Sequence, residues 1–289
     1  MSKNMLVSSK SLLQQLKYKP QKRLGQHFLT NEDVVECILD AASLNKNDTV
    51  IEVGPGMGIL TKKLAKLVST VIAVELDSKL VNLLSNYATD FPNIKVVHKD
   101  ILKINPAQLL RYRLKSTEFS SDYKVVANLP YYITNPILYH FLESTQKPSL
   151  MVLMVQKEVG EAMVARPGKM SFLSVSTQFY SDPRIIRYVP AEDFYPIPKV
   201  DSVVLRLDVY RTPPVNICNI ENFFYMVHCG FRAPRKQIHN SLALALEMPP
   251  EQIQLLLKKA SIEPKRRPET LSLQEWKQLY EVFLPIIGS

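Results

Sequence analysis

Three of the eight glycines in this 289-residue chain fall within five positions, at Gly54, Gly56 and Gly58. They follow a β-branched stretch that ends in Glu52-Val53 and precede the apolar spacing of an amphipathic helix. Glycine is needed where the backbone adopts a positive φ or where a ligand approaches the main chain closely. A glycine turn after the first strand of a sheet predicts a binding site for a nucleotide-like cofactor.

Acidic residues near the turn narrow the class of cofactor. Glu75 ends the second predicted strand, where a carboxylate can bond a ribose of either a dinucleotide or S-adenosylmethionine. The spacing is GxGxG after Glu52 instead of the GxGxxG of dinucleotide sites, and an acidic residue beside the turn suits a cationic cofactor. Asp100 closes the third strand and can accept a hydrogen bond from an adenine amino group. We therefore expect Glu52, Gly54, Gly56, Gly58, Glu75 and Asp100 to bind S-adenosylmethionine.

The tetrad Asn128-Leu129-Pro130-Tyr131 follows the fourth predicted strand, and ligands sit at the carboxyl ends of such strands. The Asn128 side-chain oxygen and the Leu129 carbonyl can each accept one N–H of an exocyclic amine, which concentrates electron density on its nitrogen. Pro130 fixes the backbone, and Tyr131 offers a face on which a base stacks, worth about 1–3 kcal/mol. The tetrad predicts methyl transfer to an adenine amino group by positioning, without a covalent intermediate.

A proline-stiffened loop, Phe194-Tyr195-Pro196-Ile197-Pro198-Lys199, precedes the last predicted strand. Phe194 can form the second side of a stacking slot with Tyr131, although a phenylalanine beside prolines is as often part of a core. Lys199 can meet a phosphate. The loop is therefore a second expected element of the acceptor site.

The elements that must position these residues alternate between strand-like and helix-like segments up to about residue 210, which is typical of an α/β sheet covered on both faces. The expected strands are 49–53, 70–74, 94–98, 123–127, 150–155, 185–189 and 202–209. Beyond Thr212-Pro213-Pro214 the pattern is helical only, over 220–230, 236–246, 250–260 and 272–283. We expect a basic arm over 1–26, a catalytic α/β domain over 27–211 and a helical domain over 212–289.

The charge is concentrated on the arm, which holds six of the nine excess positive charges and no acidic residue. A cationic arm suits a phosphate backbone, so Lys19, Lys22 and Arg23 are expected RNA contacts. A solubilising tail and a transit peptide are the alternatives, and the single arginine disfavours the second.

Cys37, Cys218 and Cys229 are widely spaced and form no CxxC pair, so neither a metal site nor a structural disulfide is predicted. No signal peptide and no apolar run long enough for a membrane span is visible, and a reducing cytoplasmic compartment is expected.

From about Arg23 to its end the chain resembles the ribosomal RNA adenine N6,N6-dimethyltransferase family, and within it the small-subunit group. The resemblance rests on segments that occur in the same order, at 25–29, 52–58, 75–77, Asp100, 128–131, 156–159, 194–202 and 231–242. It implies a seven-stranded Rossmann-like class I methyltransferase sheet with a small helical C-terminal domain. It also implies His27, Leu29 and Asn128 as further cofactor contacts, and RNA contacts on a helix that carries Arg232, Arg235 and Lys236.

The implied activity is transfer of four methyl groups to two adjacent adenosines near the 3′ end of small-subunit (16S) RNA, by a monomer acting on an assembling 30S subunit. Two residues depart from the family's usual pattern: Tyr132 stands where Asn is usual, and Pro234 where Arg is usual. Two alternatives stay open: a large-subunit RNA adenine methyltransferase that confers antibiotic resistance, and a non-catalytic RNA-binding assembly factor on the same fold.

Overall fold

The structure is a computed structural model that describes Leu13, residues 18–112 and residues 122–287. The arm residues Lys3, Lys10 and Lys17 lie outside this part of the chain. The chain divides into two compact units, one formed by residues 1–160 and 184–209 and the other by residues 161–183 and 210–289.

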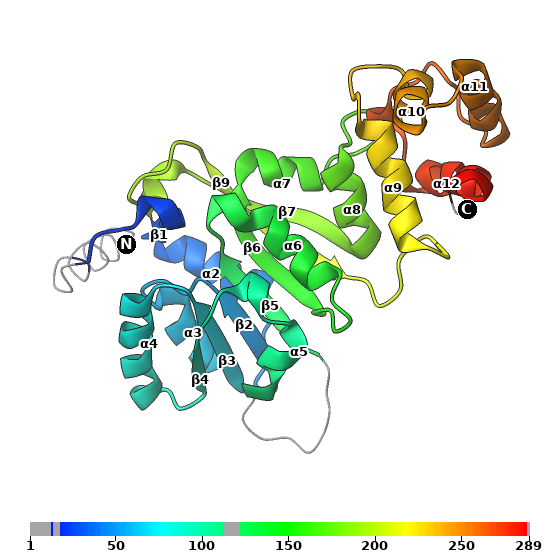
Figure 1. Cartoon of the computed structure of the whole chain (residues 1–289). Coiled ribbons are helices and arrows are strands. Elements are labelled where there is room, and N and C mark those ends of the chain that lie inside the picture. Colours follow the sequence, from blue (N-terminus) through cyan, green and yellow to red (C-terminus); the bar gives the residue numbers. More distant parts are fainter. Residues whose placement is uncertain (1–12, 14–17, 113–121, 288–289) are drawn as a thin grey trace. The chain divides into compact units, whose positions relative to one another are not determined.

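A seven-stranded mixed sheet forms the larger unit (Figure 1), and it matches the predicted number of strands. Its order is β4 (Ile94–His98), β3 (Thr70–Glu75), β2 (Thr49–Val53), β5 (Lys124–Asn128), β6 (Leu150–Gln156), β9 (Ser202–Val209) and β7 (Ser181–Val189). The pairs among the first five are parallel, whereas β9 runs antiparallel to β6. The carboxyl ends of the five parallel strands therefore meet at one edge.

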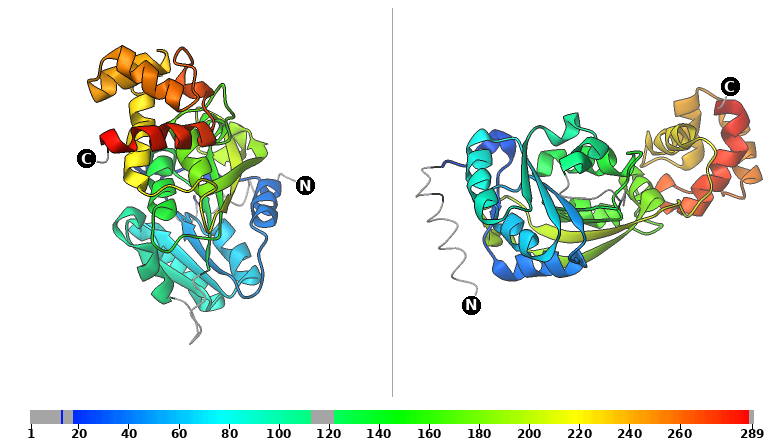
Figure 2. Two further views of the ribbon diagram at one scale, coloured as in Figure 1. Left: turned by 90° about the vertical axis from the view of Figure 1, so that its right-hand side faces the viewer. Right: turned by 90° about the horizontal axis from the view of Figure 1, so that it is seen from below.

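Helices cover both faces of the sheet (Figure 2). The sheet residues alternate between the faces, as the period of a strand requires. On one face Val50, Val126 and Val152 pack against apolar residues of α2 (Glu32–Ala41) and α3 (Ile59–Leu67). The remaining helices of this unit are α4 (Ser78–Asp90), α5 (Pro106–Leu109), α6 (Thr134–Leu142) and the start of α7 (Lys157–Met163). The strands β2, β3 and β6 are buried on both faces, which accounts for their nearly continuous apolar sequences.

A second, two-stranded sheet was not expected from the sequence. The short strands β1 (Phe28–Leu29) and β8 (Phe194–Tyr195) pair antiparallel, with Phe28 opposite Tyr195 and Leu29 opposite Phe194. Two residues are too short a run to show a strand period. The pairing joins the segment that precedes the sheet to the loop that precedes β9.

The smaller unit is helical. It contains α8 (Phe172–Tyr180), α9 (Ile220–Phe231), α10 (Ile238–Leu246), α11 (Pro250–Lys259) and α12 (Leu273–Ile287). The rings of Phe179 and Phe223 stack with centroids 5.3 Å apart. Gly230 is required on α9 because a Cβ there would lie 2.3 Å from the ring of Trp276. The domain boundary expected between residues 211 and 212 therefore leaves one helix out of the smaller unit. α8 precedes that boundary in the sequence, but it packs with the C-terminal helices. Among the described residues, no helix combines the length and the apolar character needed to span a bilayer.

Candidate functional site

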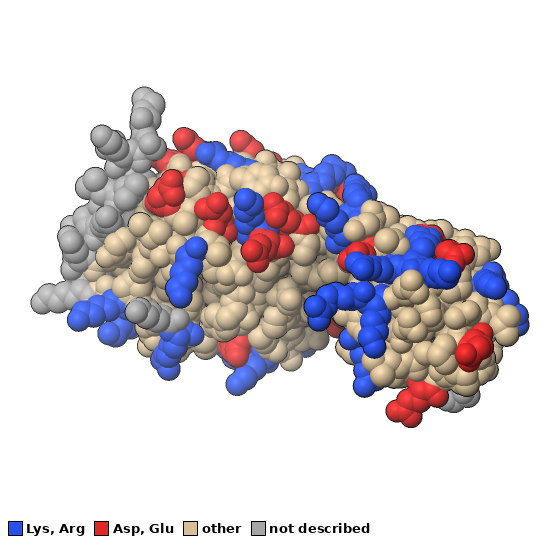
Figure 3. All heavy atoms as spheres, turned by 90° about the horizontal axis from the view of Figure 1, so that it is seen from above, with Lys and Arg blue, Asp and Glu red and all other residues tan. Residues whose placement is uncertain are grey.

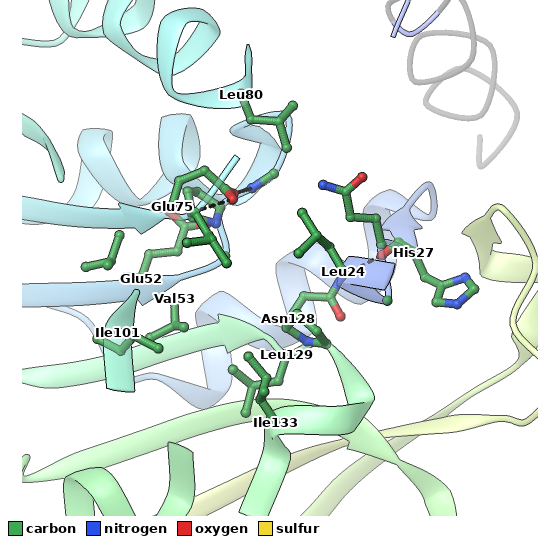
Figure 4. A pocket seen from close by; sticks show the side chains of 18 of the residues that line it. Leu24, His27, Glu52, Val53, Glu75, Leu80, Ile101, Asn128, Leu129 and Ile133 are labelled. Carbon is green, nitrogen blue, oxygen red and sulfur yellow. Dashed lines mark hydrogen bonds between the residues drawn. The ribbon is translucent and has the colours of Figure 1, made fainter. Parts of the chain in front are cut away.

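A cavity of about 340 Å³ opens at the edge where the parallel strands end, and this volume is within the usual range for a small-molecule site, roughly 300–1,000 Å³. Its walls come from the loops after β2, β3, β4 and β5, and from residues 24–29 (Figure 4). It is lined by eleven of the residues expected to bind cofactor or acceptor: His27, Leu29, Glu52, Gly54, Gly56, Glu75, Asp100, Asn128, Leu129, Pro130 and Tyr131. The folded chain therefore brings residues from five separate segments together.

The glycine turn adopts the backbone that only glycine accommodates readily. Gly54, Gly56 and Gly58 have φ of +64°, +57° and +75°. A Cβ on Gly56 would lie 3.0 Å from the ring of Phe28, and a Cβ on Gly58 would lie 2.8 Å from the ring of Tyr87. Gly58 caps α3 and does not line the cavity, so packing against α4 explains this glycine, and the expected cofactor contact is not seen.

Glu75 is held by the backbone around it. Its Oε1 accepts from the N–H groups of Leu76 and Asp77 at 2.8 and 2.9 Å, and its Oε2 accepts from the N–H of Gly56 at 3.2 Å. The carboxylate thus connects the glycine turn to the end of β3. Burial raises the pKa of Glu75, although these three donors oppose the rise. Its position at the end of β3 is the one expected for a ribose contact.

Glu52 is almost completely buried at the cavity wall, with 2% of its surface exposed. Its Oε2 has no hydrogen-bond partner among residues 18–112 and 122–287 or Leu13. Burial raises the pKa of Glu52 to about 8, and the neighbouring charge of Glu75 adds to the rise. An unpaired buried carboxylate costs free energy, and a cation bound in the cavity would offset that cost. The donor set therefore fits a cationic ligand.

This burial predicts a pH-dependent effect of Glu52→Gln on stability. In the unfolded chain the carboxyl titrates near its ordinary pKa of about 4.3, whereas in the folded chain it keeps its proton up to about pH 8. The ligand-free protein therefore loses stability as the pH rises between these values, by an amount on the order of a few kcal/mol, and the glutamine variant does not.

Thermal unfolding at pH 5, 6.5 and 8 without ligand tests this expectation. The melting temperature of Glu52→Gln should rise relative to that of the unmodified protein as the pH increases. The exposed residue Glu158 offers the control Glu158→Gln for the change in net charge. A difference that stays constant with pH would contradict the proposed state of Glu52.

Asp100 lies two residues beyond the end of β4 and caps the short 3₁₀ turn Ile101–Lys103, with its Oδ1 accepting from the N–H of Leu102 at 3.1 Å. In the part of the chain that the structure describes, its Oδ2 has no hydrogen-bond partner and could accept from a ligand. Tyr132, which also lines the cavity, lies near enough to Asp100 and Glu75 that their charges add to the rise that burial causes in its pKa. The Tyr132 ring lies 3.2 Å from the position of a Cβ on Gly25, so this departure from the usual Asn contacts the chain segment over the cavity.

Asn128 is oriented by the segment above it. Its Nδ2 donates to the backbone carbonyl of His27 at 3.1 Å, as the dashed line in Figure 4 shows. With the amide nitrogen used in this way, Oδ1 is the atom able to accept from a ligand amine. Leu129 continues from Asn128, and its N–H donates to the carbonyl of Met154 at 3.2 Å. The start of the tetrad is therefore fixed from two sides.

Tyr131 is held in place at both ends. Its ring stacks on that of His27, with centroids 5.7 Å apart and planes 21° apart, and its hydroxyl lies 2.7 Å from Oγ of Ser202. Nδ1 of His27 lies 2.6 Å from the carbonyl oxygen of Pro196. The tetrad, the histidine and the loop before β9 consequently form one connected wall.

Phe194 is placed differently from the expectation. It is 2% exposed, belongs to the core between the sheet and α2, and does not line the cavity. Its pairing with Leu29 in the small sheet holds it there. A base could stack on this ring only after the loop moves, so the slot formed with Tyr131 is absent from the described conformation. Lys199 is exposed on the same loop.

The expected RNA contacts are spread over both units. Lys19 and Arg23 are exposed in the first unit, and Lys22 begins the 3₁₀ turn Lys22–Leu24. Arg232, Arg235 and Lys236 are exposed in the second unit, but in the connection between α9 and α10 and not on a helix. Pro234 stands within that connection, where a helix cannot readily continue. Figure 3 shows lysine and arginine side chains gathered on the face of this unit that it presents.

The sequence did not indicate how large a part of the cavity wall is formed by residues 24–29. Within this segment the resemblance implied only His27 and Leu29 as cofactor contacts. Leu24, Gly25, Gln26 and Phe28 line the cavity as well. The charge distribution, in turn, assigned residues up to 26 to a basic arm. A basic, Gln-rich stretch carries no period that distinguishes a cavity-covering segment from a tail.

Comparisons with known proteins agree with this geometry. The model of the family "Ribosomal RNA adenine dimethylase" matches residues 17–284. A "Ribosomal RNA small subunit methyltransferase A" from Dehalococcoides mccartyi is 43% identical over 280 residues, which cover 97% of this chain and 94% of that protein. A protein of the same name from Clostridium botulinum is 38% identical over 283 residues, covering 97% of this chain and all of the relative.

Solved structures show the same fold. The crystal structure of the 23S rRNA methyltransferase ErmE matches with a TM-score of 0.69 and 27% identity, over 88% of this chain and 98% of that one. A dimethyladenosine transferase from Plasmodium falciparum matches with a TM-score of 0.75 and 24% identity, over 91% and 98% of the two chains.

Proposed function

The chain belongs to the ribosomal RNA adenine dimethylase family, and we propose that it transfers methyl groups to two adjacent adenosines near the 3′ end of small-subunit ribosomal RNA. It is an rRNA adenine dimethyltransferase that uses S-adenosylmethionine as methyl donor. The choice of small-subunit RNA is supported by the names of its relatives and by identities of 36–43% over nearly the whole chain. The observation that carries the chemistry is the Asn128 amide, which the His27 carbonyl orients at the cavity wall.

The cavity residues fit the donor. S-adenosylmethionine supplies an electrophilic methyl group on a positively charged sulfonium. Glu52 would lie near the cationic end, because its Oε2 is buried without a hydrogen-bond partner among the described residues. Glu75 would accept from the ribose hydroxyls and Asp100 from the adenine amino group. Gly54 and Gly56 let the ligand approach the backbone, because neither carries a Cβ that would project from the turn.

The acceptor nitrogen is activated by position alone. Oδ1 of Asn128 and the carbonyl of Leu129 each accept one N–H of the adenine amine, so that its lone pair is directed toward the methyl group. Tyr131 supports the base through a ring that His27 and Ser202 hold fixed. Oriented dipoles that need no reorganisation are an effective way to stabilise a transition state. Once methylated, the nitrogen loses its proton without a strong general base.

Contacts with the RNA backbone would come from Lys19, Lys22, Arg23, Lys199 and the connection that carries Arg232, Arg235 and Lys236. Phosphate contacts of this kind fix register and orientation, and they carry no base sequence. Selection of the two adenosines therefore depends on the cavity and on the shape of the RNA. We place the reaction in the cytoplasm, with the chain acting as a monomer on an assembling small subunit.

The proposal is tested by incubating the protein with methyl-labelled donor and undermethylated small subunits, then mapping the labelled bases. Label in two neighbouring adenosines of small-subunit RNA is the expected result. The same assay with large subunits addresses the main alternative, since one solved relative acts on 23S rRNA according to its name. Label confined to large-subunit RNA would overturn the substrate assignment, and no label in either would favour a binding factor.

A further inference from the structure

Residues 18–29 run across the cavity and end in β1 of the small sheet, and we call this segment the strap. Its second half, residues 24–29, lines the cavity, and its His27 carbonyl accepts from Asn128. Nothing in the proposed chemistry explains what holds its first half in place. The answer lies at the opposite wall, where Asp77 begins α4.

The two carboxylate oxygens of Asp77 have separate partners. Oδ1 accepts from the N–H of Lys79 at 2.9 Å and so caps α4. Oδ2 accepts from the Tyr18 hydroxyl at 2.8 Å and also from the side-chain amide of Gln21. Asp77 is 5% exposed, so these bonds are sheltered from water. Capping needs only Oδ1, which leaves the two strap contacts to be explained by another role.

Gln26 closes the cluster within the strap. Its Oε1 accepts from the N–H of Gln21 at 2.8 Å and lies 2.7 Å from the Tyr18 hydroxyl, whose single proton is shared between Gln26 and Asp77. Burial and the bond to Asp77 raise the pKa of Tyr18, so the hydroxyl remains a donor over the physiological range. The beginning and the middle of the strap are thereby fixed to each other and to α4.

Apolar packing reinforces the same connection. The Tyr18 ring meets the Phe28 ring edge-on at 6.2 Å, and both belong to a cluster with Met57 of the glycine turn and Leu80 of α4. Phe28 and Leu80 also line the cavity. The cluster joins three parts of the cofactor wall, which a purely local stabilising contact would not do.

We propose that Tyr18, Gln21 and Asp77 form a clasp that positions the strap over S-adenosylmethionine and, through the His27 carbonyl, orients the Asn128 amide. The proposal rests on the proposed function of the cavity. These are positioning residues, because the clasp lies at the beginning of the strap and its effect reaches the ligands through residues 24–29. Preorganised contacts raise affinity because the protein loses less conformational entropy when the ligand binds. Loss of the clasp should therefore weaken cofactor binding and also slow transfer.

Tyr18→Phe and Asp77→Asn test the clasp. The first removes one hydroxyl and keeps the ring packing, and the second keeps an oxygen that can cap α4. Each should raise the dissociation constant for S-adenosylmethionine, measured by calorimetry, about ten-fold. A change of this size corresponds to the free energy of one buried hydrogen bond to a charged group. The double variant should show much less than the sum of the two effects, because the residues share one bond. Gln21→Ala should give a smaller change in the same direction.

Tyr123→Phe is the matched control. The Tyr123 hydroxyl donates to the carbonyl of Gln146 at 2.9 Å, in the same unit but away from the cavity. The control should lower the melting temperature and leave cofactor affinity unchanged.

Melting temperature, affinity and turnover together separate the outcomes. If Tyr18→Phe loses stability but binds and reacts as the unmodified protein does, the clasp is structural only and the inference is overturned. If the unmodified protein itself binds no S-adenosylmethionine, the proposed function fails first, and the clasp's role fails with it.

Discussion

Asn128→Ala should slow methyl transfer by about 10²–10³-fold, the usual effect of removing one preorganised electrostatic contact from a transition state. The amide nitrogen donates to the His27 carbonyl, so the amide oxygen is the atom proposed to accept from the adenine amine. Alanine removes that acceptor while the cavity and its other lining residues remain. The dissociation constant for S-adenosylmethionine should stay within about ten-fold of its original value, since Glu52, Glu75 and Asp100 are untouched. Single-turnover kinetics with saturating donor measure the chemical step directly.

Asn93→Ala is the matched control for this variant. Asn93 also donates through Nδ2 to backbone carbonyls, those of Ala65 and Val68, but it does not line the cavity. It should lose stability and keep its rate. Equal rates for Asn128→Ala and the unmodified protein would remove Asn128 from the mechanism, and equal losses in both asparagine variants would point to a general effect on folding.

Gly56→Ala should nearly abolish cofactor binding, with a dissociation constant raised on the order of 100-fold or more. A left-handed backbone costs a non-glycine residue about 1–2 kcal/mol. The new Cβ would also lie 3.0 Å from the Phe28 ring of the strap, and relief of that contact would displace the N–H that Gly56 donates to Glu75. One methyl group thus disturbs the turn, the strap and the Glu75 carboxylate together. Calorimetric titration with S-adenosylmethionine measures the loss.

Gly168→Ala separates backbone strain from the effect on the site. Gly168 has a φ of +108°, and a Cβ there would have nothing within 4 Å. It lies in the helical unit, outside the cavity. This control should melt at a lower temperature and bind the donor normally. Normal binding by Gly56→Ala would show that the turn does not contact the cofactor.

The strands of the sheet could be predicted closely because each is a short apolar run with clear ends. Three of them, Thr49–Val53, Ile94–His98 and Ser202–Val209, have the expected boundaries. β7 begins at Ser181, four residues before the predicted start, and the added residues include Pro183. A proline is tolerated on an edge strand, and β7 is at the edge of the sheet. Edge position is a property of the folded sheet that the local sequence does not contain.

The candidate site could be predicted where a residue type has one strong physical reason for its position. Glycines in a turn and carboxylates at strand ends have such a reason, and all of those predicted except Gly58 line the cavity. Phe194 has two equally good uses, stacking or core packing, and the structure uses it in the core. The bond from Tyr18 to Asp77 spans 59 positions and leaves no period or spacing. Contacts of that kind depend on the complete fold.

The pairing of β1 with β8 constrains anyone who wishes to redesign this enzyme. The loop before β9 is a natural place to alter which nucleotide enters, and Tyr195 and Phe194 at its start lie opposite Phe28 and Leu29 in the small antiparallel sheet. Those partners line the cofactor cavity. Libraries that diversify this loop for a new acceptor will therefore also change donor affinity, and screens run at low donor concentration will discard useful acceptor variants. Selection at saturating donor avoids that loss.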